Sequence, residues 1–194
     1  MVFGRLVEIF SNIPTLKSER LTLRGMQVCD CFDMYDYARR PEVTRFLTWS
    51  PHPDVEYTKA YLDSLKSYYE LGSFYDWAVI WGEENKMIGT CGFTSVSIPN
   101  NSAEIGYVIN PDYRGRGIAV EAARRVMRFG FEEMGLNRIE ARYMVGNDAS
   151  KRVMEKLGMT FEGVYRSSVC INGIYRDVGM CSILKSEYES LGEK

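Results

Sequence analysis

Apolar and polar positions alternate, or apolar residues gather, in five segments of the chain in the manner of β-strands. The predicted strands are 20–24, 77–81, 87–93, 104–110 and 138–145. The second and third are separated only by a charged Gly-Glu-Glu-Asn turn, which is typical of a hairpin.

Four other segments carry apolar residues at helical spacing and end in residues that favour helix termini. Asp30 and Asp54 are predicted to cap helices that run to about Arg39 and Glu70, and Pro41 and Gly72 follow them. The remaining two predicted helices are 117–135, and 147–157 with Asn147 or Asp148 as cap and Gly158 as stop.

The order of these elements predicts the sheet topology. A helix of about five turns separates strands 104–110 and 138–145, so we expect them to be parallel and joined by a right-handed crossover. The chain ends in a hairpin, 169–176, whose Asn172-Gly173 pair favours a type I′ turn. The sequence therefore predicts a mixed α/β (α+β) fold, mostly antiparallel, with one central parallel βαβ unit.

Composition narrows the function classes. The 194 residues suit one domain, and 24 basic against 26 acidic residues give a net charge of −2. This balance argues against a general nucleic-acid or membrane-surface binder. No run reaches transmembrane length and residues 1–10 lack a signal-peptide pattern, so we expect a cytoplasmic protein.

Cysteine and histidine usage argues against a metal centre. The five cysteines are odd in number and lack CxxC spacing, which indicates reduced thiols. His52 is the only histidine, lies between two prolines, and is expected at the surface of a loop. We therefore predict no metal cofactor.

The segment between the strand 104–110 and the following helix carries the clearest functional signal. Gly115 and Gly117 let the backbone approach a ligand closely, while Arg114 and Arg116 add positive charge. The unpaired N–H groups and the positive end of the helix dipole meet at this turn. The order strand, glycine-rich turn, helix predicts a site for a phosphate or pyrophosphate.

Four short sequence blocks, in their order along the chain, resemble the motifs of one known family. Arg114–Ala119 fits the acyl-CoA pyrophosphate motif of the GNAT N-acetyltransferases, and 104–107, 147–150 and 155–159 resemble its ribosomal-protein (Rim) branch. The resemblance covers residues 17–185 and implies a GNAT-like sheet with helices on both faces. It leaves an N-terminal extension, 1–16, and a C-terminal tail, 186–194.

The resemblance implies acetyl-CoA as the donor. Its pyrophosphate would lie on the N–H groups of the turn, and its pantetheine arm would pair like an added strand with the preceding backbone, where the two parallel strands splay apart. Asn147 would bond the pantetheine amides, although simple helix capping explains it equally well. The implied contacts are Val108, Ile109, Asn110, Arg114, Gly115, Arg116, Gly117, Ile118, Ala119 and Asn147.

Two residues are candidates for the chemistry. Glu104 would act as a base on the amine, either directly or through water, and the alternative is that it is a strand-end carboxylate paired with an arginine. Ser150 would hold or protonate the departing thiol, or the thiolate would leave unaided, since thiols ionise near ~8.5. Many family members use a tyrosine seven residues after the Asn, but this chain has Met154 there.

The acceptor is less defined. Trp49 and Tyr69 are candidate contacts, because the first two helices and their loop form one wall of the acceptor site in the family, although aromatic clusters are usually core. Candidate acceptors are a protein N-terminus of ribosomal type, or a small amine such as a polyamine, amino sugar or amino acid. A non-catalytic acyl-CoA or RNA binder is the alternative class. The terminal hairpin offers an edge for a homodimer.

Overall fold

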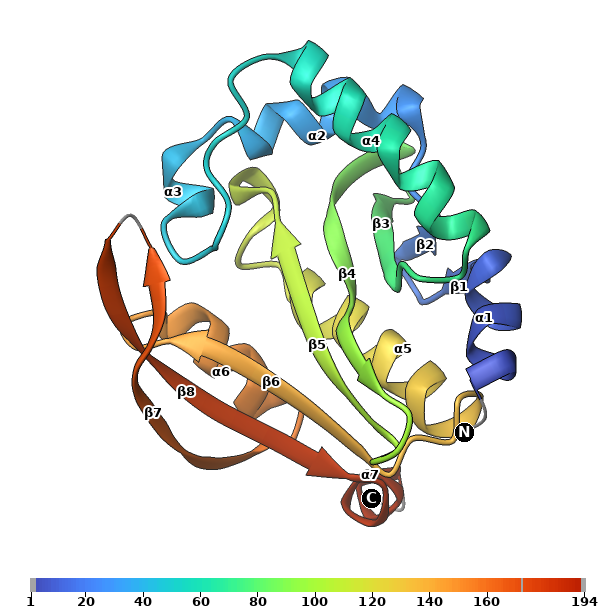
Figure 1. Cartoon of the computed structure of the whole chain (residues 1–194), viewed down its shortest axis with the longest axis vertical. Helices are drawn as coiled ribbons and strands as arrows, with labels where there is room; N and C mark the ends of the chain where they lie inside the picture. The colour runs from blue at the N-terminus through green and yellow to red at the C-terminus, as the bar shows by residue number, and fades with distance from the viewer. Residues whose placement is uncertain (1–2, 172, 193–194) are drawn as a thin grey trace.

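The alternating and apolar segments pair into one eight-stranded sheet in the order β1-β2-β3-β4-β5-β6-β8-β7 (Figure 1). All neighbours are antiparallel except β5 and β6, so the predicted fold class is confirmed. The computed structural model describes residues 3–171 and 173–192. The strands are β1 Leu16–Lys17, β2 Leu21–Arg24, β3 Asp76–Trp81, β4 Lys86–Ser97, β5 Ser102–Ile109, β6 Arg138–Met144, β7 Thr160–Ile171 and β8 Ile174–Leu184.

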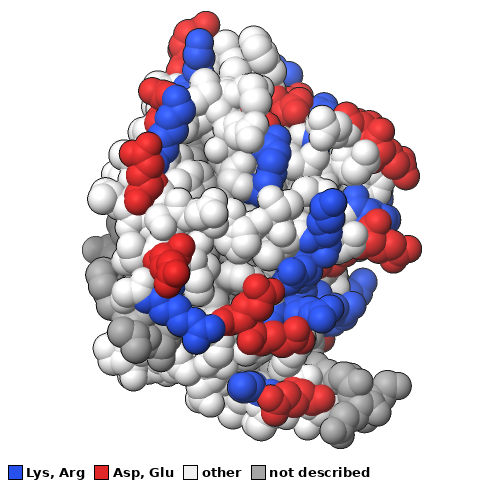
Figure 2. Space-filling view, turned by 90° about the vertical axis from the view of Figure 1, so that its right-hand side faces the viewer, with Lys and Arg blue, Asp and Glu red and all other residues white. Residues whose placement is uncertain are grey.

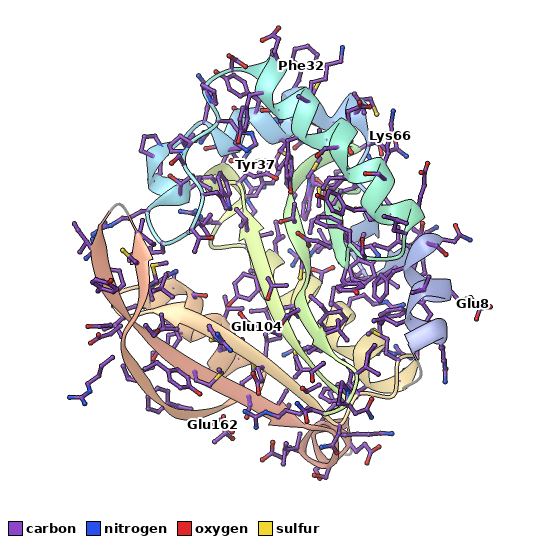
Figure 3. All side chains as sticks on the ribbon, in the orientation of Figure 1. Glu8, Phe32, Tyr37, Lys66, Glu104 and Glu162 are labelled. Carbon is purple, nitrogen blue, oxygen red and sulfur yellow. The ribbon has the colours of Figure 1, made fainter. Side chains whose placement is uncertain are left out.

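Helices cover one face of the sheet through an apolar cluster. Met34 and Tyr37 of α2 and Leu62 of α4 pack on Ile80 and Met87 of the sheet, and Figure 3 shows Tyr37 directed toward the strands. The helices of this face are α2 Cys31–Ala38, α3 Pro41–Thr44 and α4 Val55–Glu70, and a short 3-10 turn, η1 Val28–Asp30, precedes α2.

A larger cluster forms on the other face. Ala122, Val126 and Phe129 of α5 are buried against the sheet together with residues of α6, so the predicted helices on both faces are confirmed. The remaining elements are η2 Pro111–Tyr113, α5 Ile118–Glu132, α6 Asp148–Lys156, α1 Phe3–Ser11 and α7 Lys185–Gly192.

The segment ahead of residue 17 contributes to this larger core. Phe10 of α1 is fully buried, and its ring lies 4.7 Å from Tyr75, 5.6 Å from Trp77 and 6.2 Å from Phe129. At the other end of the chain, Tyr188 of α7 stacks on Phe131 with ring centroids 4.7 Å apart.

The central parallel pair is short. β5 and β6 pair only from Ser102–Arg138 to Glu104–Glu140, although β5 continues to Ile109 and β6 to Met144. The two strands therefore separate beyond Glu104, and Figure 1 shows the resulting gap between their far ends.

Two local expectations need correction. Asp30 stands at the start of α2 but does not cap it, because its carboxylate accepts two hydrogen bonds from Arg24, at 2.8 and 2.7 Å, and one from the N–H of Gln27. His52 is buried and not at the surface, since its Nδ1 lies 2.8 Å from the Thr58 hydroxyl and its ring packs on Tyr57.

The terminal hairpin is longer than predicted, and its tip is exposed. Ile171 pairs with Ile174, so a two-residue loop joins β7 and β8. Asn172 lies outside the described residues, and the predicted turn type stays a prediction. Tyr165 and Tyr175 are more than half exposed on this hairpin, whose outer strand is the edge of the sheet.

The described surface mixes charges of both signs. Figure 2 shows acidic and basic side chains interspersed over the side of the molecule that carries α1. Among the described residues, no helix has the length and apolarity to cross a membrane, and no group of three or more His, Cys, Asp or Glu side chains is arranged to hold a metal. The five cysteines are free thiols.

Truncation of Phe10 tests whether α1 belongs to the core. Phe10→Ala should lower the free energy of unfolding by about 3–5 kcal/mol, because it leaves a cavity among three aromatic rings. The matched control is Phe32→Ala, at a position 72% exposed, which should change stability by less than about 0.5 kcal/mol. Equal urea midpoints for the two variants would contradict the burial of α1.

Asp76 should make stability fall as pH rises. Burial raises the pKa of its carboxyl to about 7, against the hydrogen bonds from the Trp77 N–H and Thr90. Between the unfolded value near ~4 and 7 the folded chain holds a proton that the unfolded chain has lost, so the free energy of unfolding declines by an amount on the order of a few kcal/mol.

The isosteric variant Asp76→Asn should lack this decline. Urea denaturation at about pH 4.5 and about pH 8 is the measurement, and wild type should lose more stability than the variant between the two. An identical loss in both proteins would show that Asp76 ionises freely in the fold.

Candidate active site

A cavity of about 420 Å³ lies where the end of β5 meets the first turn of α5, with α3 and α6 on its sides. We call it the donor pocket. It brings together predicted donor-site residues from three separate segments, namely Val108, Ile109, Arg114, Gly115, Gly117, Ile118, Ala119, Asn147 and Ser150. The structure thus assembles most of the residues that the motifs singled out.

The turn into α5 presents backbone N–H groups to this pocket. Gly115 and Gly117 both have φ of 78°, a left-handed conformation that a side chain would strain. Gly117 is the N-cap of α5 and has no side chain to cap it, and the first bond of the helix runs from Glu121 N to Gly117 O. The N–H groups before Glu121 are therefore available to an anion, at the positive end of the helix dipole.

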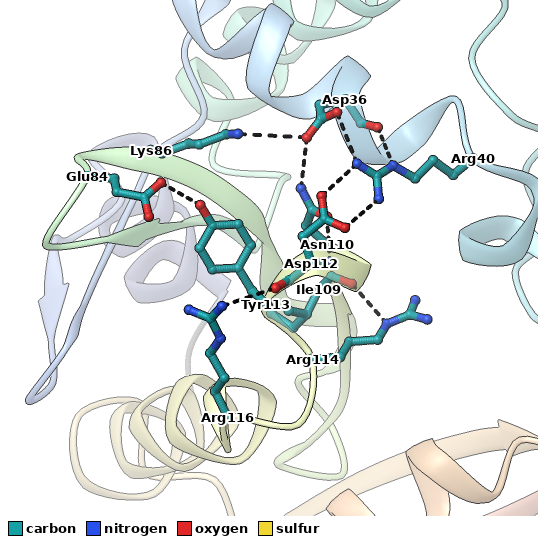
Figure 4. Close-up of polar contacts among 10 residues, drawn as sticks. All are labelled: Asp36, Arg40, Glu84, Lys86, Ile109, Asn110, Asp112, Tyr113, Arg114 and Arg116. Atoms are coloured by element: carbon teal, nitrogen blue, oxygen red, sulfur yellow. Dashed lines mark hydrogen bonds and ion pairs between the residues drawn. The ribbon is translucent and has the colours of Figure 1, made fainter.

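A charged network holds the chain that leads into this turn (Figure 4). Arg40 donates to both carboxylate oxygens of Asp112, at 2.9 and 2.8 Å, and to Asp36 at 3.1 Å. Lys86 lies 3.7 Å from Asp36 on the other side. The network joins α2 to η2 and so fixes the position of the glycine-rich turn relative to the sheet.

Asn110 belongs to this network and does not line the donor pocket. It is fully buried, its amide donates to Asp36, and its side-chain oxygen accepts from the N–H of Asp112. Its own N–H donates to Ile88 and its carbonyl accepts from Tyr113, so its N–H is not available to a pantetheine arm. Its contribution is to shape the turn.

Arg116 is not among the residues that line the pocket. Its guanidinium lies over the ring of Tyr113, 5.3 Å from the centroid, and its carbonyl accepts from Arg20 at 3.1 Å. The Tyr113 hydroxyl donates to Glu84 at 2.6 Å, and this bond and burial raise its pKa to about 12. Arg20 also pairs with Glu121, which ties the turn to β2.

The charge within the donor pocket suits an anionic ligand. Arg114, Arg152 and Lys156 line it, against the single acidic residue Glu42. A local excess of positive charge is compatible with the net charge of −2, because the acidic residues lie elsewhere.

Asn147 and Ser150 are positioned by the start of α6. The Asn147 side-chain oxygen accepts from the N–H of Ser150 at 3.2 Å, which confirms the predicted cap. Both residues also line the pocket, so the cap places them one turn apart at its wall.

Tyr107 is a pocket residue that sequence reasoning missed as a site residue. Its hydroxyl lies 3.1 Å from the Ser150 hydroxyl and 3.1 Å from the Ser150 carbonyl oxygen. Burial raises the pKa of Tyr107, against the bond to Ser150. It stood within the block 104–107 that carried the resemblance, but only the fold shows that it reaches α6.

Glu104 lies at the point where β5 and β6 begin to separate, and Figure 3 places it in the space between them. Its carboxylate is 3.2 Å from Arg142 Nε, so the arginine pairing foreseen as the alternative is present. Burial raises the pKa of Glu104, while Arg142 and Thr94 lower it. A carboxylate with a raised pKa remains suited to proton transfer.

Glu104 does not line the donor pocket, and three other positions named from the sequence lie outside it as well. Met154 is buried in the main core, so the position of the usual tyrosine does not face the ligand space. Tyr69 accepts from the N–H of Met26 and donates to the carbonyl of Asp76, which is a structural role. Trp49 is half-buried, with its ring 5.4 Å from His52.

Comparisons with known proteins agree with this geometry. The family model described as "Acetyltransferase (GNAT) domain" matches residues 20–160. The "Uncharacterized N-acetyltransferase p20" of Bacillus licheniformis is 35% identical over 176 residues, 91% of this chain and 99% of the relative. The ribosomal protein uS5-alanine N-acetyltransferase of Escherichia coli (strain K12) is 27% identical over 176 residues, 86% of this chain and 90% of the relative.

A solved structure is similar over nearly the whole fold. The acetyltransferase (GNAT family) from Bacillus anthracis has a TM-score of 0.79 and 29% identity, covering 89% of this chain and 99% of that one. With the family match spanning well over half of the residues, this chain belongs to the GNAT family of N-acetyltransferases, which transfer an acetyl group from acetyl-CoA to an amine.

Proposed function

We propose that this enzyme acetylates the N-terminal α-amino group of a protein, by direct attack of the amine on acetyl-CoA in a ternary complex. The observation that carries the donor half is the donor pocket, where the N-terminus of α5, Asn147 and Ser150 meet beside the separated strands. The pyrophosphate would lie on the turn at Gly115–Ala119, and the pantetheine arm would run along Val108 and Ile109.

The chemistry of the acceptor favours an α-amine. The attacking nitrogen must be neutral, and an α-amine has a pKa near ~8 against ~10.4 for a lysine, a difference of roughly 3 kcal/mol in the free energy of deprotonation. A single carboxylate such as Glu104, acting through a water molecule, is adequate for the easier task. The Escherichia coli relative that is named as a ribosomal-protein-alanine N-acetyltransferase supports the same acceptor class.

The alternative acceptor is a small amine, such as a polyamine, an amino sugar or an amino acid. Rates with Ala- and Ser-starting peptides, with the same peptides blocked at the N-terminus, and with the small amines distinguish the two classes. Turnover confined to unblocked peptides supports the proposal, whereas turnover confined to small amines overturns it. A protein that binds acetyl-CoA but acetylates none of them is a non-catalytic binder.

Introduction of a negative charge at the pocket tests the donor site. Ala119→Glu places a carboxylate in the first turn of α5, where helical backbone accommodates it and the helix dipole favours it. Because it occupies the place proposed for the pyrophosphate, we expect the Kd for acetyl-CoA to rise at least about tenfold, or ~1.4 kcal/mol. Isothermal titration calorimetry is the measurement.

The matched control is Ala60→Glu, which adds the same charge at an exposed position of α4 outside the pocket. It should bind acetyl-CoA like wild type. Unchanged affinity in Ala119→Glu as well would mean that the pyrophosphate lies elsewhere.

Replacement of Glu104 tests the base. A base works only when deprotonated, so kcat/KM of wild type should fall as pH drops through the raised pKa of Glu104. Glu104→Gln should lower kcat/KM by about 10²–10⁴-fold and remove the part of this decline that Glu104 causes, so that only the decline from protonation of the amine, near ~8 for an α-amine, remains. A variant that keeps the wild-type rate and pH profile would leave Glu104 only its pairing with Arg142.

A further inference from the structure

The contact between Tyr107 and Ser150 connects β5 and α6 at the wall of the donor pocket. The tyrosine hydroxyl lies 3.1 Å from both oxygens of Ser150, the side-chain hydroxyl and the backbone carbonyl. Tyr107, Ser150 and Asn147 all line the same cavity as the turn into α5. A hydroxyl pair at this place is close to any group that extends from the turn toward the gap between the strands.

The donors and acceptors of this contact can be counted. Tyr107 and Ser150 each own one hydroxyl hydrogen, and the Ser150 carbonyl can only accept. Tyr107 has one hydrogen for the two Ser150 oxygens, and either hydroxyl can be the donor between the two side chains. When Tyr107 shares its hydrogen between both oxygens, the serine hydrogen is free to point into the pocket, and this is the arrangement that the inference uses. Hydrogen bonds in such a chain polarise each other, so the bond from Tyr107 makes Ser150 a stronger donor.

The protonation state of Tyr107 is compatible with that role. Burial raises its pKa above the ordinary value, so the phenol keeps its proton and stays a donor at neutral pH. Met154, at the position of the usual tyrosine, does not contact the pocket, because it is 1% exposed and packs in the main core.

We propose that Tyr107 is a positioning residue that orients Ser150 as the hydrogen-bond donor to the departing CoA thiolate. The inference rests on the proposed function of the donor pocket. As the amine nitrogen bonds to the carbonyl carbon, the C–S bond breaks and its electron pair goes to sulfur, while the surplus proton on nitrogen passes to the proposed base, Glu104, through water. Ser150 donates a hydrogen bond to that thiolate, Tyr107 donates to Ser150, and neither loses its proton. The thiolate takes its proton from water after release, since thiols ionise near ~8.5.

A double-mutant cycle tests the dependence of one residue on the other. Ser150→Ala should lower kcat by about 10²-fold, the usual loss for one donor to a developing negative charge, and Tyr107→Phe by about tenfold. Because Tyr107 acts through Ser150, the double variant should have the kcat of Ser150→Ala alone. The KM for acetyl-CoA should stay near that of wild type in all three.

Two outcomes overturn the inference. If Tyr107→Phe has the wild-type kcat, Tyr107 has no role in the reaction. If the two losses in kcat multiply in the double variant, Tyr107 acts independently of Ser150. The matched control is Tyr188→Phe, which removes a tyrosine hydroxyl that bonds to Glu132 outside the donor pocket and should keep the wild-type kcat.

Three further measurements keep the test decisive. Ser150→Thr retains the hydroxyl, and adding Tyr107→Phe to it should still cost about tenfold in kcat. If Tyr107→Phe fails to fold, fluorotyrosine at position 107 keeps the shape and donates more strongly, so kcat should rise, and an unchanged kcat counts against the inference. Wild type that transfers no acetyl group to any amine would defeat the proposed function itself, whereas a failed cycle in an active enzyme defeats only the role of Tyr107.

Discussion

The site depends on the early end of the pairing between β5 and β6, which leaves backbone groups of β5 without a strand partner. The two strands pair over three positions and then separate, while β5 stays paired with β4 on its other side as far as Ile109. Beyond Glu104 one edge of β5 therefore lacks a strand partner, although buried backbone groups require hydrogen bonds. A ligand that ran along this edge would supply the missing partner, and an extended amide-bearing arm has suitable donors and acceptors.

The elements around the two strands fix the walls of the gap between β5 and β6. The aromatic core around Phe10, Trp77 and Phe129 fastens α1 and α5 to one face, and α2 and α4 close the other. The pairs of Arg40 with Asp36 and Asp112 fix the chain between β5 and the glycine-rich turn. Because both ends of the turn are anchored, its N–H groups have their direction set before any ligand arrives, which lowers the entropic cost of binding.

The residues around the glycine-rich turn are of two kinds: some line the donor pocket, and others hold the turn in place through bonds within the protein. The turn into α5 and the start of α6 present groups to the donor pocket. Asn110, Arg116 and Glu121 shape the turn through bonds within the protein. A glycine-rich motif thus indicates where an anion can approach the backbone. Polar residues near the glycines, such as Arg116, stabilise the fold instead of lining the pocket. Only the pattern of hydrogen bonds distinguishes these two kinds of residue.

The sequence by itself determined the features that depend on local physics. Alternation and helical spacing predicted most strands and helices, and the helix between 104–110 and 138–145 required a parallel crossover. The glycines marked the turn where the backbone can approach a ligand closely, and Asn147 marked the cap of the next helix, because these are effects of residues on their own neighbours.

Tertiary structure alone decided which distant groups meet. Asp30 bonds Arg24 and leaves α2 without a side-chain cap, and His52 is buried against Thr58. Tyr107 reaches Ser150 across 43 positions of sequence, and Glu104 pairs with Arg142. Such contacts depend on the register of strands and the docking of helices, and a period of two or 3.6 residues carries no information about which partner lies opposite.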